Sequence, residues 1–185
     1  MTAPRSLETK RLWLVQPGPA EAEAVVRYFE RNRAHLEPWE PERPRGFYTP
    51  AFWRARLEAN LSEAQSGLAV RYFLLRPGPP NVERVIGTCN FTNITMGAFC
   101  ACNLGYGLDA EHVGQGLMTE AIAAAMPAVM EAHGLHRVMA NYIPENARSG
   151  AVLERLGFKI EGLAPKYLYL GGEWRDHVLT SFVRD

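Results

Sequence analysis

Apolar positions in the first half of the chain change between alternation, which is typical of strands, and a spacing of three to four residues, which is typical of helices. After the Pro17–Pro19 turn, helical spacing from Ala22 to Phe29 predicts a helix. Thr49 is a typical N-cap residue and Pro50 is typical of a first helical turn, so they predict the start of a second helix. Gly67 predicts its end. Strands are predicted at 12–15, 68–76, 82–94 and 98–109. The last three, with turns between them, predict an antiparallel meander.

The second half continues with a helix, a strand, a second helix and a hairpin. Apolar pairs recur at helical spacing from Leu117 to Met130, and Pro127 inside this stretch predicts a kink. Asn146 is an N-cap type for a shorter helix, and the Gly171-Gly172 pair predicts the hairpin turn. Strands are predicted at 137–143, from Phe158 onward, and after residue 172. The order β-α-α-β-β-β-α-β-α-β-β has no repeat and no linker, so we expect one α/β domain over residues 1–185, with one mixed sheet and helices on it.

Composition and charge exclude several classes of function. The 185 residues include 20 Lys and Arg against 20 Asp and Glu, so the formal charge is zero. General binding to nucleic acid or to anionic membranes needs a basic excess, which this chain lacks. The longest apolar stretch, Ala121–Met130, is half a membrane span, and the N-terminal residues lack the apolar run of a signal peptide. We expect a cytoplasmic protein with no membrane contact and no sequence-specific nucleic-acid contact.

The three cysteines predict neither a disulfide framework nor a metal site. Cys89, Cys100 and Cys102 are odd in number, and no histidine follows them at metal-ligand spacing. Cys100 and Cys102 are two residues apart in a predicted strand, so we expect both side chains to point to one face as small core groups.

The segment Gly114-Gln115-Gly116 is the most informative one, because it joins a strand end to the start of the helix at Leu117 and Met118. A helix N-terminus has free N–H groups and a partial positive charge, and glycine lets a phosphate approach the backbone. The two glycines alone favour a plain strand-to-helix turn, and only the residues after them favour a phosphate site. A second pattern, Gly105-x-Gly107-x-x-Ala110, lies inside a strand and is a chance match to dinucleotide-binding loops.

The residues that follow resemble a known family. The motif Gly114-x-Gly116-Leu117-Met118-Thr119-Glu120-Ala121, the pair Asn146-x-x-Ser149 and the run 153–158 resemble the acetyl-CoA core of the GNAT superfamily of N-acetyltransferases. The segments 32–41, 87–91, 136–142, 148–150 and 174–180 resemble its ribosomal-protein alanine N-acetyltransferases of the Rim type. Glu111 departs from the superfamily pattern, which prefers Arg or Gln there, and this puts a side-chain contact to phosphate in doubt.

This resemblance implies the GNAT fold and acetyl-CoA as co-substrate, without a metal. The fold is a single mixed, mostly antiparallel sheet with a splayed central strand pair and helices on both faces. The resemblance places the pantetheine arm of the co-substrate against the backbone of Tyr106 to Leu108, with the Leu108 amide as oxyanion donor. The cofactor-binding residues of the phosphate loop are then Gly114, Gln115, Gly116, Leu117 and Met118.

Two further residues of this implied site have open alternatives. Asn146 is either a helix cap alone or a cap that also contacts the cofactor. Ser149 either donates a hydrogen bond to the departing thiolate or is an ordinary serine of the first helical turn. No general base is identified, so we expect proton removal through water.

The implied reaction is direct acetyl transfer, through a tetrahedral intermediate, to the N-terminal α-amine of an alanine-starting ribosomal protein of the small subunit. An α-amine has a pKa near 8, so about a tenth is neutral at pH 7. Trp39, Glu40, Glu42 and Tyr167 are the expected acceptor contacts; the alternative is a solvated acidic loop with Trp39 as its core anchor. Two rival functions are acetylation of a small-molecule amine and a non-catalytic acyl-CoA-binding module in ribosome assembly or regulation.

Overall fold

A computed structural model describes residues 2–78 and 84–184. The described residues form one eight-stranded sheet, with the strands in the spatial order β1-β2-β3-β4-β5-β6-β8-β7. The strands are β1 (Ser6–Glu8), β2 (Trp13–Val15), β3 (Val70–Leu75), β4 (Val85–Thr95), β5 (Ala101–Leu108), β6 (Arg137–Tyr142), β7 (Lys159–Leu170) and β8 (Glu173–Val183). Neighbouring strands are antiparallel except β5 and β6, which are parallel. The predicted α/β class and the mixed, mostly antiparallel sheet are confirmed.

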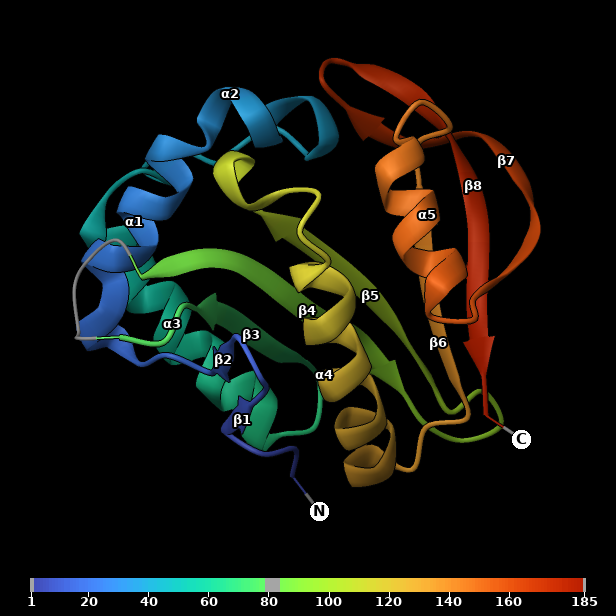
Figure 1. Cartoon of the computed structure of the whole chain (residues 1–185), viewed down its shortest axis with the longest axis horizontal. Helices are drawn as coiled ribbons and strands as arrows, with labels where there is room; N and C mark the ends of the chain where they lie inside the picture. Colours follow the sequence, from blue (N-terminus) through green and yellow to red (C-terminus); the bar gives the residue numbers. More distant parts are fainter. Residues whose placement is uncertain (1, 79–83, 185) are drawn as a thin grey trace.

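Helices cover both faces of the sheet (Figure 1). The helices are α1 (Ala22–Arg31), α2 (Arg33–Leu36), α3 (Pro50–Gln65), α4 (Leu117–His133) and α5 (Ala147–Arg155), with 3-10 turns η1 (Pro19–Glu21), η2 (Glu37–Trp39) and η3 (Ala110–His112). Helices α4 and α5 pack with one face of the sheet in one apolar cluster, and α1 and α3 pack on the other face in a second cluster. Within the described residues, no helix is apolar and long enough to cross a membrane.

The predicted face of α4 is the one that packs on the sheet. All the apolar pairs from Leu117 to Met130 are buried. Pro127 lies on the exposed side, and the helix continues through it to His133. Gly134, with a positive φ of 62°, is the C-cap. A stacked pair of aromatic rings, Phe29 and Trp53 at 4.9 Å, holds α1 against α3 on the opposite face.

Two predicted helix caps are confirmed by their hydrogen bonds. The hydroxyl of Thr49 accepts from the amide of Phe52, and Oδ1 of Asn146 accepts from the amide of Ser149 at 3.2 Å. The Gly171-Gly172 turn, with both φ angles positive, joins β7 and β8 as predicted.

Other predictions differ from the structure. Cys100 precedes β5 with a φ of 43°, and its thiol contacts the carbonyl of Gly97, so its predicted core position beside the buried Cys102 is wrong. The turn interrupts the alternation on which that prediction rested. The sequence patterns also missed β1 and α2, which are too short to show a period. The predicted turn at 78–81 and the start of the predicted strand 82–94 lie partly outside the described residues.

Candidate functional site

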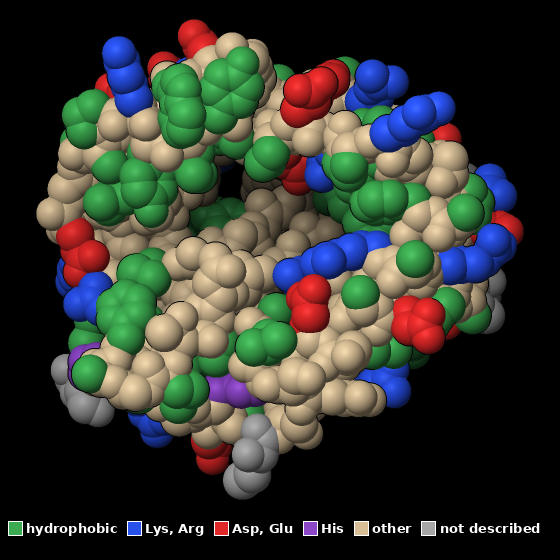
Figure 2. Space-filling model, turned by 180° about the vertical axis from the view of Figure 1, so that it is seen from behind, with side chains coloured by type: hydrophobic (Ala, Val, Ile, Leu, Met, Phe, Trp, Pro, Cys, Tyr) green, Lys and Arg blue, Asp and Glu red, His purple; other side chains and the backbone are tan. Residues whose placement is uncertain are grey.

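The two central strands diverge after a short paired stretch. Strand β5 pairs with β6 at only three positions, Ala101 with Arg137, Cys102 with Val138 and Asn103 with Met139. From residue 104 to 108, β5 has no pairing with β6 among the described residues. Figure 1 shows the strands separating toward α2 and α5, and Figure 2 shows the molecule hollowed there when seen from behind. The splayed strand pair implied by the resemblance is confirmed, and we call the space between the strands the opening.

The register of β5 determines which backbone groups face the opening. The amide of Asp109 donates to the carbonyl of Ile86 in β4 at 2.7 Å. Successive N–H groups of a strand point to opposite edges, so the amides of Leu108 and Tyr106 point away from β4 and toward the opening. The Leu108 amide, which is the predicted oxyanion donor, therefore faces the opening.

A tyrosine and a serine meet at the opening. The Tyr106 hydroxyl lies 2.8 Å from Oγ of Ser149 and 3.2 Å from its carbonyl oxygen. Burial raises the pKa of Tyr106 to about 12, so its hydroxyl is neutral at neutral pH. The sequence analysis assigned only the backbone of Tyr106 to the site and missed its side chain. The alternation of β5 was the available signal, because it directs the even-numbered side chains to the face that α5 covers.

The loop before α4 presents bare backbone to solvent. Gly114 and Gly116 have φ angles of 78° and 73°, and Gly116 is the helix N-cap without a side-chain cap. No heavy atom lies within 4 Å of an ideal Cβ at Gly114. The side chains of Leu117 and Met118 are buried in the core, so these two residues offer only backbone groups to a ligand. The side-chain amide of the exposed Gln115 donates to the carbonyl of Glu111.

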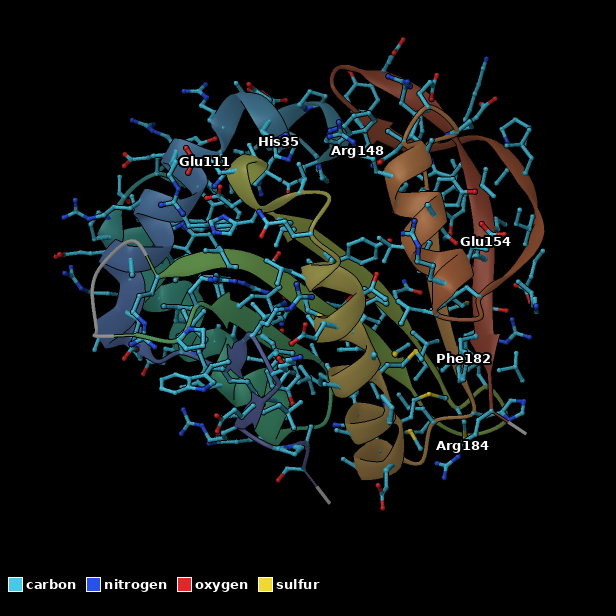
Figure 3. The ribbon with its side chains drawn as sticks, in the orientation of Figure 1. His35, Glu111, Arg148, Glu154, Phe182 and Arg184 are labelled. Atoms are coloured by element: carbon cyan, nitrogen blue, oxygen red, sulfur yellow. The ribbon has the colours of Figure 1, made fainter. Side chains whose placement is uncertain are left out.

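Arg11 holds this loop, and the sequence analysis missed it. Its guanidinium donates to the carbonyl of Gln115 at 2.9 Å and to the Glu120 carboxylate at 2.6 Å, and Thr9 donates to the same carboxylate. Burial alone would raise the pKa of Glu120, but the hydrogen bonds from Thr9 and Arg11 lower it. Glu111, the residue that departs from the superfamily pattern, lies in η3 and is exposed (Figure 3).

A buried carboxylate fixes the end of β5. Asp109 accepts hydrogen bonds from Arg31 at 2.7 Å, from Asn32 at 3.0 Å and from the amide of Glu111 at 3.0 Å. Burial alone would raise the pKa of Asp109, but the bonds from Asn32 and Arg31 lower it to about 2. This network connects α1 to the residue that follows Leu108.

The predicted acceptor contacts lie on two segments that flank the same end of the opening (Figure 1). Trp39 is 39% exposed, so the alternative in which it anchors the core is wrong. Glu40 forms an ion pair with Arg43 and is not a free carboxylate, whereas Glu42 lines a pocket of about 310 Å³. Tyr167 is 42% exposed at a bulge of β7.

The side chains around Tyr167 join β6 to the last hairpin. Asn141 of β6 donates to the Tyr167 hydroxyl at 3.4 Å, and the ring of the buried His177 lies 5.5 Å from the Tyr167 ring. Arg148 extends from the first turn of α5 at this end of the molecule (Figure 3).

Known proteins are similar to this chain in sequence and in fold. A family model described as acetyltransferase (GNAT) domain matches residues 11–159. The ribosomal protein uS5 alanine N-acetyltransferase of Escherichia coli is 41% identical over 175 residues, which are 95% of this chain and 89% of that protein. The ribosomal-protein-S5-alanine acetyltransferase of Vibrio fischeri superposes with a TM-score of 0.91 at 40% identity, over 97% of both chains. Mycobacterium smegmatis RimJ in complex with CoA-disulfide has a TM-score of 0.85 at 30% identity, over 93% of this chain and 81% of that one.

Proposed function

Because the chain belongs to the acetyltransferase (GNAT) family, we propose that it transfers the acetyl group of acetyl-CoA to the N-terminal α-amine of an alanine-starting ribosomal protein. The two similar proteins from E. coli and V. fischeri carry this acceptor in their names. The observation that carries the proposal is the unpaired edge of β5, which presents the amides of Tyr106 and Leu108 to the opening. A protein of the small ribosomal subunit is the proposed partner.

Residues at the opening fit coenzyme A. The glycine loop and the free N–H groups of the first turn of α4 suit a diphosphate, because nothing covers Gly114 and no side chain caps the helix. The free backbone groups of β5 suit an extended pantetheine arm, which pairs with them as an added strand would. Asn146 caps α5 through Oδ1, which accepts from the Ser149 amide, and its Nδ2 group suits a further contact to the cofactor.

When bound, acetyl-CoA supplies the thioester carbonyl that the acceptor amine attacks. The Leu108 amide donates to the carbonyl oxygen as negative charge develops on it, and such a donor lowers the barrier by about 3–4 kcal/mol. The Tyr106 hydroxyl is neutral and lies 2.8 Å from Oγ of Ser149. In the proposed step it donates to Oγ, so that the serine proton is directed to the departing thiolate. In this step the carbon–sulfur bond breaks and the sulfur takes that proton. The serine regains a proton from the water that accepted the proton of the amine.

The acceptor amine needs little help to lose its proton. With a pKa near 8, about a tenth of the α-amine is already neutral at pH 7, whereas a lysine amine is almost fully charged. Water in the opening therefore suffices to remove the proton. Glu42, Trp39 and Tyr167 form the proposed walls for the basic N-terminal segment of the acceptor, whereas the pairing of Glu40 with Arg43 weakens its attraction for a basic chain.

Thiol release in a mixture of acetyl-CoA and short peptides tests the proposal. Two peptides of one sequence start with alanine and contain an internal lysine, and only one has a free N-terminus. We expect thiol release with the free terminus and none with the blocked one. Equal rates would exclude α-amine specificity. Turnover with a polyamine and none with either peptide would favour the small-molecule acetyltransferase, and no release with any acceptor would favour the non-catalytic module.

A further inference from the structure

A polar pocket of about 160 Å³ lies between α3 and the sheet, on the face that α1 and α3 cover. Asn60 of α3 and Thr88 and Asn90 of β4 line it. In the sheet register, Thr88 lies opposite Gly107 and Asn90 lies opposite Gly105 of β5. The pocket therefore adjoins the strand that carries the proposed oxyanion donor.

Of the two glycines on this face of β5, Gly105 leaves the backbone bare, whereas Leu36, Tyr28 and Thr88 cover Gly107. An ideal Cβ at Gly105 has no heavy atom within 4 Å, and one at Gly107 would lie 3.5 Å from the hydroxyl of Tyr28. Neither glycine has a positive φ, so the backbone conformation does not require glycine at these positions. Glycine inside a strand often marks a place where a ligand or another backbone approaches closely.

Polar atoms without a protein partner belong to residues that line the pocket. Among the described residues, none bonds Oδ1 of Asn60, Oδ1 of Asn90 or Nε1 of Trp53. Asn60 is only 7% exposed and Trp53 only 6%. Buried polar atoms are satisfied by water or by a ligand. The indole N–H suits a peptide C=O, and the two amide oxygens suit the N–H groups of two successive peptide groups. Glu40, whose Oε2 also lacks a hydrogen bond, forms an ion pair with Arg43.

The distance from the reacting amine to the pocket suits a short piece of peptide. Neighbouring strands are about 4.8 Å apart, and an extended residue spans about 3.4 Å. A chain whose amine lies at the edge of β5 that faces the opening therefore crosses Gly105 and reaches Asn90 within about two residues. The hollow in Figure 2 lies on this side of the molecule.

We infer that this pocket binds the peptide groups that follow the first residue of the acceptor, an assignment that rests on the proposed function. Recognition of backbone groups selects a peptide over a simple amine and tolerates different sequences after the first residue. Gly105 keeps the route from the opening to the pocket free, and Asn60 and Asn90 accept the N–H groups of the acceptor.

Gly105→Val tests the route, with Gly162→Val as its matched control. Gly162 lies in β7 and, like Gly105, has no heavy atom within 4 Å of an ideal Cβ. Valine is favoured in strands, so neither substitution is expected to weaken folding. We expect Gly105→Val to raise the KM for trialanine amide about tenfold or more. The Kd of coenzyme A, measured by calorimetry, stays unchanged, and Gly162→Val changes neither constant. An unchanged KM in Gly105→Val overturns the inference.

Asn60→Leu tests the pocket itself. The wild type is expected to use trialanine amide better than alanine amide, and Asn60→Leu to lose about tenfold of that preference, because a buried peptide N–H loses its acceptor. Thermal unfolding of both proteins checks the fold, and Gly105→Val gives an independent answer where Asn60→Leu unfolds. If the wild type acetylates both acceptors equally well, the pocket assignment fails and the proposed function stands. If it acetylates neither, both fail.

Discussion

The Tyr106 hydroxyl lies 2.8 Å from Oγ of Ser149 and so joins β5 to the first turn of α5 across the opening. The two residues are 43 positions apart in the chain. Either hydroxyl can donate in this contact, and the Tyr106 hydroxyl also lies within 3.2 Å of the Ser149 carbonyl oxygen, so the tyrosine holds the serine at two atoms. In the proposed mechanism, Ser149 donates the proton to the thiolate and Tyr106 positions Ser149.

Ser149→Ala is expected to lower kcat about a hundredfold, because the thiolate then leaves without a positioned proton donor. Tyr106→Phe should lower kcat less, since Oγ of Ser149 remains. Steady-state thiol release gives kcat, and calorimetry with coenzyme A gives a Kd that neither change should alter. Tyr169→Phe, at an exposed tyrosine of β7, is the control. Full kcat in Ser149→Ala would remove its role as proton donor.

Gly114→Ala is expected to weaken binding of coenzyme A about tenfold, because a Cβ in the loop obstructs the approach of the diphosphate to the backbone. Gly97→Ala is a close control, since Gly97 has a φ of 77° against 78° for Gly114, and an ideal Cβ at either position has no heavy atom within 4 Å. Both substitutions should cost about 1–2 kcal/mol of stability through left-handed strain. Equal Kd values in the two variants would contradict a phosphate site at this loop.

Arg11→Ala is expected to raise the KM for acetyl-CoA several-fold and to leave kcat near the wild-type value. The reason is that Arg11 joins the carbonyl of Gln115 to Glu120 and so fixes the loop before the substrate arrives. Lys10→Ala removes the same charge one residue earlier, at an exposed side chain. A similar rise in KM for both variants would indicate general charge attraction, which added salt weakens, instead of loop positioning.

Asp109 is expected to make folding sensitive to acid. Its pKa is about 2 in the folded chain against an ordinary 3.8, so the unfolded state binds the proton first as pH falls. The stability that this carboxylate contributes is complete above about pH 4, decreases as pH falls from 4 to 2, and amounts to about 2 kcal/mol.

Urea unfolding of the wild type and Asp109→Asn at pH 6 and pH 3 measures this effect. Between pH 6 and pH 3, we expect the free energy of unfolding to fall by about 1 kcal/mol more in the wild type than in the variant. Only the wild type has a carboxylate at this position, which is protonated in the unfolded state at pH 3 but not in the folded state. At pH 6 the variant should be less stable by about 3 kcal/mol, since Arg31 loses its buried partner. Equal pH dependence in the two proteins would show that Asp109 does not contribute.

Local patterns in the sequence were sufficient to predict most helices and strands. The apolar pairs of α4, the caps at Thr49 and Asn146 and the final hairpin were predicted, because each depends on residues a few positions apart. The predicted phosphate loop and Ser149 rested on the family resemblance, because the two glycines alone favour a plain strand-to-helix turn. The splayed strands came from the family resemblance, because no local pattern records where two strands stop pairing.

Only the tertiary structure decided the contacts that hold the site in place. Arg11 and Glu120 are 109 residues apart, and Arg31 and Asp109 are 78 apart, so no spacing rule brings them together. The pairing of Glu40 with Arg43 and the exposure of Trp39 likewise depend on how the segment after α2 packs. Sequence periodicity specifies which face of an element is buried, but the partner of a polar side chain is determined by the packing of distant elements, where burial makes each hydrogen bond matter.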